Sequence, residues 1–94
     1  MTIKKYRISP EEYDVMEYDG NIIALIAFVG RENLIIDNFD NIRVYLKTRE
    51  GIRELGETEY SYRFIVEVGI GNFMAFDDKG FELCDFEEVK GEAQ

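Results

Sequence analysis

The sequence predicts an α+β fold in which one main helix packs on a mostly antiparallel sheet of five to seven short strands. Three observations support this prediction. Apolar residues make up 46% of the 94 residues, including seven Phe and six Tyr, which is enough for the core of a single domain over residues 1–94. Residues 22–29 carry apolar side chains at helical spacing. Several short β-branched and aromatic segments are separated by turns that contain Gly.

The chain begins with two segments of extended character. Residues 1–8 are compatible with an extended segment that stops at Ser9 and Pro10. Residues 13–18 mix apolar and acidic side chains in a way typical of a strand, and the Asp-Gly-Asn sequence of residues 19–21 predicts a turn after it.

The clearest helix in the sequence begins after Asn21, whose side chain is a suitable N-cap. Its apolar residues recur at helical spacing, and they are Ile22, Leu25, Ile26 and Val29. Gly30 stands where a left-handed cap is expected to end the helix. Ile23 and Phe28 widen the apolar stripe, so we expect this helix to be covered on most sides.

Short β segments account for most of the remaining chain. The strands that we expect are residues 34–36, 42–48, 52–55, 64–68, 73–76 and 86–89. Gly51 ends a hairpin turn, and a second turn lies at residues 69–71. Asp77 or Asp78 is expected to cap one short helical turn, and residues 90–94 to form a loose tail.

The composition favours binding over catalysis. The chain has 20 Asp and Glu against 11 Lys and Arg, a net charge of -9 and no His. Because His is the usual proton shuttle near pH 7, acid–base chemistry would need a carboxylate or Lys with a shifted pKa. DNA and RNA are poor direct partners, since phosphate binding needs a basic surface, whereas a basic protein surface is a suitable partner.

Charge is distributed unevenly along the sequence. Three basic residues lie within residues 1–9, five acids lie within residues 11–20, and seven acids follow from Asp77 onward. If the two acidic segments share a face, their fields add over a Debye length of about 8–10 Å. That arrangement depends on the tertiary structure.

Motifs that suggest chemistry have simpler structural explanations. Cys84 lies beside Asp85 and lacks the basic neighbour that activates a thiol. We therefore expect Cys84 to be a small, buried or half-buried apolar residue with a structural role. Asp77, Asp78 and Glu82 lack the ligand spacing of a calcium loop. Paired acids act as a glycosidase dyad only across a cleft, which a chain this short rarely builds. We therefore expect no catalytic residue, no metal site and no cofactor.

The sequence also predicts a cytoplasmic protein that does not contact a membrane. A single cysteine cannot form an internal disulfide, which is typical of a reducing compartment. Pro10 and two acids follow the first basic residues, unlike the apolar run of a signal peptide. The longest strongly apolar stretch, residues 22–29, is less than half the length of a membrane helix.

The order of several short motifs resembles that of a family of small uncharacterised proteins encoded by tailed phages and prophages. The family pattern is a Tyr-x-Gly-Asn-like turn, a helix that ends at Gly, a Thr-x-Glu-Gly hairpin, then Tyr-Ile-Ile, Gly-Glu-Phe and a second Phe eight residues later. The matching stretches are Tyr18-Asp19-Gly20-Asn21, the helix to Gly30, Thr48-Arg49-Glu50-Gly51, Phe64-Ile65-Val66, Gly71-Asn72-Phe73 and Phe81. The resemblance spans nearly the whole chain.

The chain departs from this family pattern in two places. Asn72 replaces the Glu before Phe73, and residues 76–79 are Phe-Asp-Asp-Lys where the family usually has Cys-Lys-Pro-Asp. The resemblance implies a compact α+β domain of phage or prophage origin, and hence the cytoplasm of an infected or lysogenic bacterial host. The family has no established activity, so the resemblance implies no mechanism.

Our leading hypothesis is a phage-encoded, non-enzymatic protein that blocks a basic site on a host protein, such as a nucleic-acid-binding or defence protein. Acids on a rigid surface can mimic nucleic-acid phosphates and steer the encounter. The candidate partner-binding residues are Glu11, Glu12, Asp14, Asp77, Asp78, Glu82, Asp85, Glu87, Glu88, Tyr60 and Tyr62. Exposed Tyr among acids is typical of a binding hot spot. Alternatively, Tyr60 and Tyr62, which share a strand face by alternation, pack across that face.

Two alternative functions belong to other classes. A homo-oligomer could sequester a small nucleotide-like signal in a pocket between subunits, and Arg53 and Arg63 are the candidate ligand-binding residues for that role. The second alternative is an accessory protein in virion assembly.

Overall fold

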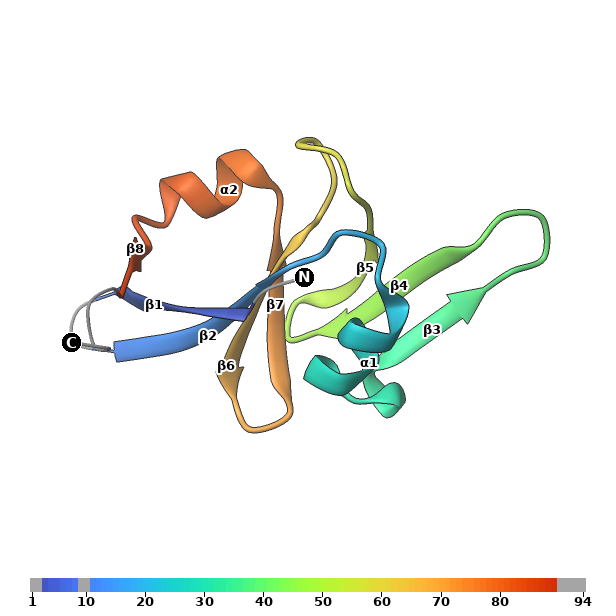
Figure 1. Cartoon of the computed structure of the whole chain (residues 1–94), viewed down its shortest axis with the longest axis horizontal. Helices are drawn as coiled ribbons and strands as arrows, with labels where there is room; N and C mark the ends of the chain where they lie inside the picture. The colour runs from blue at the N-terminus through green and yellow to red at the C-terminus, as the bar shows by residue number, and fades with distance from the viewer. Residues whose placement is uncertain (1–2, 9–10, 90–94) are drawn as a thin grey trace.

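The computed structural model describes residues 3–8 and 11–89, whose strands form two antiparallel sheets (Figure 1). The larger sheet has the order β7-β6-β2-β1-β8, and the smaller sheet has the order β3-β4-β5. The larger sheet contains β1 (Ile3–Ile8), β2 (Glu11–Glu17), β6 (Phe64–Gly69), β7 (Asn72–Phe76) and β8 (Glu87–Glu88). The smaller sheet contains β3 (Leu34–Asp37), β4 (Arg43–Thr48) and β5 (Gly51–Leu55). The helices are α1 (Ile22–Val29), the 3-10 turn η1 (Arg31–Asn33) and α2 (Asp78–Leu83).

The structure confirms the α+β class, the main helix and the antiparallel pairing. The described strands number eight, and they are divided between two sheets where the sequence analysis expected one. The division arises because β3, β4 and β5 are consecutive hairpin partners, whereas β6 pairs with β2 from the start of the chain. The predicted stop at Ser9 and Pro10 and the predicted tail at residues 90–94 lie outside the described residues.

The boundaries of α1 follow the predicted caps. The side-chain oxygen of Asn21 accepts a hydrogen bond from the backbone N–H of Ala24 at 3.0 Å. Gly30 has a φ of 86°, and its N–H donates to the carbonyl of Ile26 at 2.9 Å, which ends the helix. The structure confirms that α1 is covered on most sides, because six of its eight residues belong to the core or pack against it. Only the stripe of Ile23, which is 81% exposed, and Ala27 faces solvent.

Both sheets contribute to one hydrophobic core beneath α1. Register places Met16, Ile65 and Ala75 side by side on one face of the larger sheet. The buried core residues are Met16, Tyr18, Leu25, Val29, Leu34, Val44, Leu46, Leu55, Ile65, Phe73 and Ala75. The backbone N–H of Arg49 donates to the carbonyl of Phe73 at 3.1 Å and so joins the two sheets directly. Burial of these side chains is the main source of stability.

An aromatic cluster covers the opposite face of the larger sheet. Register pairs Tyr6 with Tyr13 and Phe64 with Phe76. Figure 1 shows that α2 lies over the larger sheet. Phe81 of α2 stacks on Phe64 with ring centroids 4.3 Å apart. Phe86, which follows α2, stacks on Phe81 at 4.7 Å and meets Tyr6, Tyr13 and Phe76 at their edges. This cluster sets the position of α2 against the sheet.

Candidate binding groove

An open groove lies between the loop of residues 56–63 and the start of α2. We call it the α2 groove. Its volume is about 710 Å³, and it is lined by Glu59, Tyr60, Phe64, Asp77, Asp78, Lys79, Phe81 and Glu82. Four of these residues are acids and one is a base. The candidate residues Tyr60, Asp77, Asp78 and Glu82 are therefore brought together in one place.

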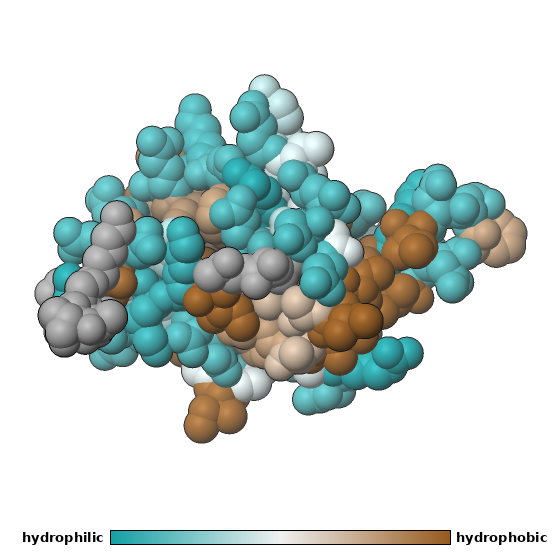
Figure 2. Space-filling model, in the orientation of Figure 1, coloured by the Kyte–Doolittle hydropathy of each residue, from teal (hydrophilic) through white to brown (hydrophobic). Residues whose placement is uncertain are grey.

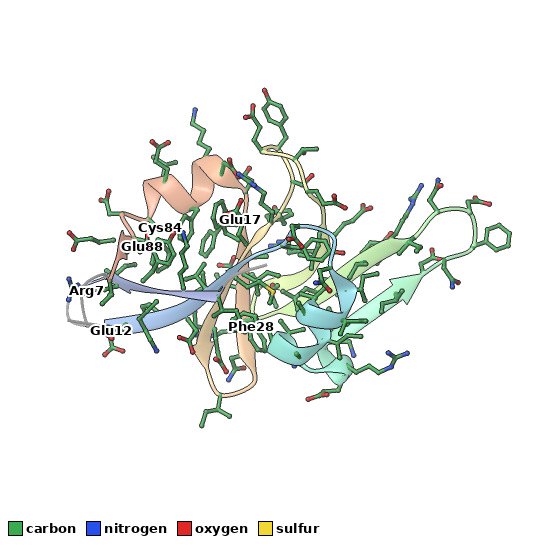
Figure 3. The ribbon with its side chains drawn as sticks, viewed as in Figure 1. Arg7, Glu12, Glu17, Phe28, Cys84 and Glu88 are labelled. Atoms are coloured by element: carbon green, nitrogen blue, oxygen red, sulfur yellow. The ribbon has the colours of Figure 1, made fainter. Side chains whose placement is uncertain are left out.

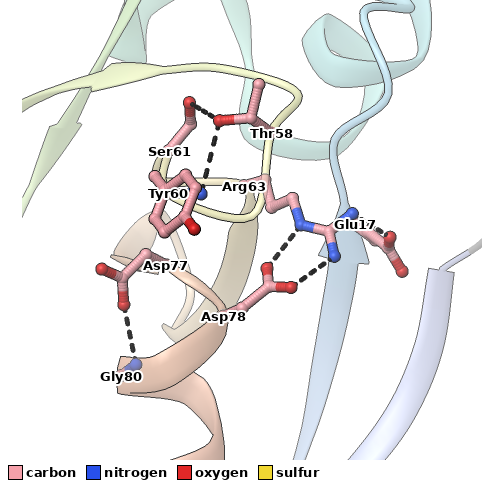
Figure 4. A network of polar contacts seen from close by, with 8 residues as sticks. All are labelled: Glu17, Thr58, Tyr60, Ser61, Arg63, Asp77, Asp78 and Gly80. Atoms are coloured by element: carbon pink, nitrogen blue, oxygen red, sulfur yellow. Dashed lines mark hydrogen bonds and ion pairs between the residues drawn. The ribbon is translucent and has the colours of Figure 1, made fainter.

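The start of α2 is held in place by Asp77. Its side-chain oxygen accepts a hydrogen bond from the backbone N–H of Gly80 at 2.7 Å (Figure 4), which confirms the predicted capping role. Asp85, another candidate residue, follows the end of the helix with a φ of 58°, and its N–H donates to the carbonyl of Glu82 at 3.1 Å. Asp is one of the few residues other than Gly that adopt this left-handed conformation readily. Asp85 is thus exposed but serves to end the helix.

The opposite wall of the groove is a tight turn that presents Tyr60 to solvent. The backbone N–H of Tyr60 donates to the hydroxyl oxygen of Thr58 at 3.3 Å (Figure 4). The backbone N–H of Ser61 donates to the carbonyl of Thr58 at 3.0 Å. The turn is joined to α2 because the N–H of Asp78 donates to the carbonyl of Glu59 at 3.4 Å. These bonds fix the backbone while the Tyr60 side chain remains 85% exposed.

Arg63 ties the groove to the larger sheet. Its guanidinium donates two hydrogen bonds to the Asp78 carboxylate, at 2.5 and 2.7 Å, and one to Glu17 at 2.5 Å (Figure 4). It also lies 5.1 Å from the ring centroid of Phe64. The hydrogen bond from Arg63 lowers the pKa of Asp78 and raises the pKa of Arg63. Arg63 therefore has two bound carboxylates, and Asp78 is the inner, neutralised acid of the groove.

The Asp78 carboxylate should make stability depend on pH. Its folded pKa lies below the ordinary value of 3.8, so its contribution is present above that value and is lost as pH falls through the lowered folded pKa. We expect Asp78→Asn to unfold at lower urea concentration than the wild type at pH 7, with the difference shrinking in acid. Urea titrations across the acid range measure this. Glu82→Gln, on the exposed side of the same helix, should track the wild type throughout; a difference for Asp78→Asn that does not change with pH would contradict the assignment.

The remaining candidate acids flank β1 at the other end of the larger sheet. We call this arrangement the β1 ladder: basic side chains of β1 lie between acids of β2 and β8. Its ion pairs are Lys5–Asp14 at 2.8 Å, Lys4–Glu88 at 3.8 Å and Arg7–Glu87 at 3.8 Å. Register sets Arg7 opposite both Glu12 and Glu87, and Figure 3 shows Arg7, Glu12 and Glu88 at the same end of the molecule. The two acidic segments do meet here, but with the basic strand between them.

Exposure of the β1 ladder limits what its ion pairs contribute to stability. Exposed pairs are typically worth about 0–1 kcal/mol each. Their larger effect is on the electric field at longer distance, because each base of β1 cancels the charge of the acid with which it pairs. Glu11 and Glu12 carry no ion pair within the described residues, and with Asp14 they line a smaller depression of about 280 Å³ beside β6. The ladder has a weaker net charge than the sequence suggests.

The two candidate tyrosines have different surroundings. Tyr60 lines the α2 groove, whereas Tyr62 lies under Arg53, whose guanidinium carbon is 5.6 Å from the ring centroid. Tyr62 also bridges to Leu55 and is less than half as exposed as Tyr60. The turn at residues 58–61 breaks the strand alternation from which a shared face was expected. Arg53 and Arg63, the candidate ligand-binding pair, contact different partners and do not converge on one site.

Four important residues of the site are not among the sequence candidates: Glu17, Glu59, Phe64 and Phe81. Phe64 and Phe81 could have been singled out, since both belong to the motifs that carry the family resemblance. No local pattern marks Glu17, which is 46 residues from Arg63 in sequence. Such a contact is set only by the pairing of β2 with β6.

Comparisons of the chain with protein-family models, curated proteins and solved structures found no match. Over the described residues, no group of three or more His, Cys, Asp or Glu is arranged to hold a metal ion. No helix in that part of the chain is both long and apolar enough to cross a membrane.

Proposed function

We propose that this protein is a non-enzymatic binding protein whose α2 groove takes basic side chains of a partner protein and so blocks that partner's basic surface. One observation carries the proposal. The ring of Tyr60 is exposed at a groove that also presents the carboxylates of Glu59, Asp77 and Glu82. Exposed Tyr with surrounding acids is a combination that favours Arg or Lys as the partner residue.

The groove offers a different contact to each part of a basic side chain. Carboxylates attract the charged end, and the face of Tyr60 adds a cation–π contact. Phe64 and Phe81, which stack on each other, supply apolar surface for the methylene stem. Because Asp77 and Asp78 are already held by Gly80 and Arg63, little side-chain freedom is lost when a partner binds.

The net charge supports this role at longer range. A charge of -9 attracts a basic partner and raises the association rate. The phage or prophage origin that the resemblance implies would make the partner a host protein, and nucleic-acid-binding and defence proteins are suitable candidates because they bear basic surfaces.

The proposal predicts strong dependence of association on salt. We expect the association rate with a captured partner to fall about tenfold or more between about 50 and about 500 mM salt, because screening removes the steering. Affinity capture from a bacterial lysate at the lower salt identifies the partner, and stopped-flow or surface-based kinetics with the purified partner measures the rate. A rate that stays constant across this range would contradict charge-driven recognition.

A matched pair of variants distinguishes the groove from the β1 ladder. Glu82→Gln and Glu12→Gln remove the same charge from exposed positions at the two sites. Both should reduce the association rate modestly, but only Glu82→Gln should also speed dissociation, because only the groove contacts the bound partner. Equal effects on dissociation would place the interface elsewhere.

The alternative role, in which the protein sequesters a small nucleotide-like signal, has no comparable support. It requires unpaired cationic groups, whereas the guanidinium of Arg63 is bonded to Asp78 and Glu17, and that of Arg53 lies over Tyr62. A thermal-shift screen against nucleotides still tests it directly. A role in virion assembly stays a hypothesis, and an inventory of purified particles would decide it.

A further inference from the structure

We propose that β3 pairs antiparallel with β3 of a second copy of this chain, which would join the two smaller sheets into one six-stranded sheet. Among the described strands β3 has a single neighbour, β4, so alternate backbone N–H and C=O groups of Leu34–Asp37 face outward. The sequence of this strand is Leu-Ile-Ile-Asp, with no Pro and no Lys to discourage pairing. This inference is independent of the proposed function of the α2 groove.

The other three sheet edges are protected against pairing. β8 has only two residues, both Glu. β7 lies against the β4–β5 turn, where the N–H of Arg49 donates to the carbonyl of Phe73. β5 carries Arg53 and Glu54, and its end is occupied by the bridge between Leu55 and Tyr62. Natural edge strands use short lengths, charges and covering segments to avoid association. β3 is short and ends at Asp37, but its first three residues are apolar and no described segment covers its outer edge.

Exposed apolar side chains are concentrated around this edge. Figure 2 shows hydrophobic residues gathered over α1 and β3, while hydrophilic residues cover most of the rest of that view. Among the described residues, twelve large hydrophobic side chains are exposed, and four of them lie on β3 or in the loop that follows it: Ile35, Ile36, Phe39 and Ile42. An apolar patch beside an unpaired strand favours a protein contact over solvent.

The charge of this region favours a second copy as the occupant. Residues 22–55 contain five bases and five acids, so their net charge is zero and the whole charge of -9 lies in the rest of the chain. The acidic parts of two copies would repel each other, and contact through the neutral region keeps them apart in a molecule 46 Å long. At physiological salt, repulsion is largely screened beyond a Debye length of about 8 Å.

The charges at the two ends of β3 complement each other in an antiparallel pair. Two bases and one acid lie near its start: Arg31, Lys47 and Glu32, with the Lys47 ammonium donating to the Glu32 carbonyl at 3.3 Å. Two acids and one base lie near its end: Asp37, Asp40 and Arg43, with Arg43 opposite Asp37 in the register. A two-fold axis at the centre of β3 sets each positive end against the partner's negative end. An unrelated extended peptide would not be expected to carry the complementary charges at its two ends.

Sedimentation equilibrium of the full chain tests the proposal. We expect a mass that rises from the 11.0 kDa of one chain toward twice that value between about 1 µM and about 1 mM protein. Ile35→Lys should weaken the dimer at least about tenfold, because it adds a charge to each side of the joined edge. The matched control is Ile52→Lys, which makes the same change on the same solvent-facing side of the sheet but on β5. This variant should dimerise as the wild type does.

Hydrogen exchange of the wild type provides a measurement that needs no variant. Amides of residues 34–37 should exchange more slowly at high protein concentration, whereas amides of residues 51–55 should exchange at the same rate at every concentration. A chain that stays monomeric at the highest concentration would overturn the proposal. The same holds if β3 of such a monomer pairs with a peptide from another protein. A dimer that Ile35→Lys and Ile52→Lys weaken equally would also overturn it.

Discussion

Replacing Phe81 with Ala should lower the free energy of unfolding by about 3 kcal/mol, the low end of the range for buried aromatic residues, because Phe81 is half-buried. Its ring stacks on Phe64 and Phe86 and meets the edge of Tyr6 at 5.1 Å. Loss of the ring removes the main attachment of α2 to the larger sheet. Urea unfolding at neutral pH measures the difference, which is a large share of the total stability of a domain this small.

The control for this prediction is Leu83→Ala in the same helix. Leu83 is 73% exposed, so its truncation should change the unfolding free energy by less than about 0.5 kcal/mol. Phe81→Ala should also abolish partner binding, because α2 forms one wall of the groove. If both variants destabilise the protein equally, the aromatic cluster is not what holds α2.

Replacing Tyr60 with Ala should weaken partner binding by about thirtyfold, as expected for an aromatic hot spot worth about 2 kcal/mol. The unfolding free energy should not change, because the side chain is exposed and the turn is held by backbone bonds to Thr58. Isothermal titration calorimetry with the purified partner gives the affinity, and urea unfolding gives the stability. The variant therefore separates binding from folding, which Phe81→Ala does not.

Tyr62→Ala is the matched control for Tyr60→Ala. Both remove a tyrosine ring from the same loop, but Tyr62 contacts Arg53 and does not line the α2 groove. Its loss should leave the affinity within about threefold of the wild type, since residues outside the interface core contribute little. An affinity that falls equally in both variants, or in neither, would remove Tyr60 from its proposed role.

The structure changes which acids are expected to matter. The sequence analysis lists nine acids as candidate partner-binding residues. In the fold, Asp14, Glu87 and Glu88 are paired with β1, Asp78 is paired with Arg63, and Asp77 caps α2. Glu82 therefore remains the candidate acid of the groove whose side chain makes no structural hydrogen bond or ion pair within the described residues, and Glu59 joins it, whereas Asp77 contacts both Gly80 and the groove. Substitution of Asp77 or Asp78 would disturb the position of α2 and binding together, whereas substitution of Asp14, Glu87 or Glu88 would remove an exposed ion pair outside the groove.

The local elements of this protein could be predicted from short stretches of its sequence. The caps of α1 at Asn21 and Gly30, the cap of α2 at Asp77 and the hairpin at Gly51 all depend on residues within one or two turns of each other. Their hydrogen bonds close over short loops, so the residue type at a single position is sufficient to favour them. The α+β class and the antiparallel pairing follow from the order of these elements.

The grouping of charged and aromatic side chains could not be predicted in this way, because it depends on contacts between distant strands. β1 lies between β2 and β8, although β8 is about eighty residues farther along the chain, and its basic side chains pair with acids from both acidic segments of the sequence. Arg63 binds Asp78 and Glu17 in the same way, from distant positions. The pairing of distant strands depends on how well the whole core is buried. The hydrophobic periodicity within one strand does not indicate which other strand will pair with it.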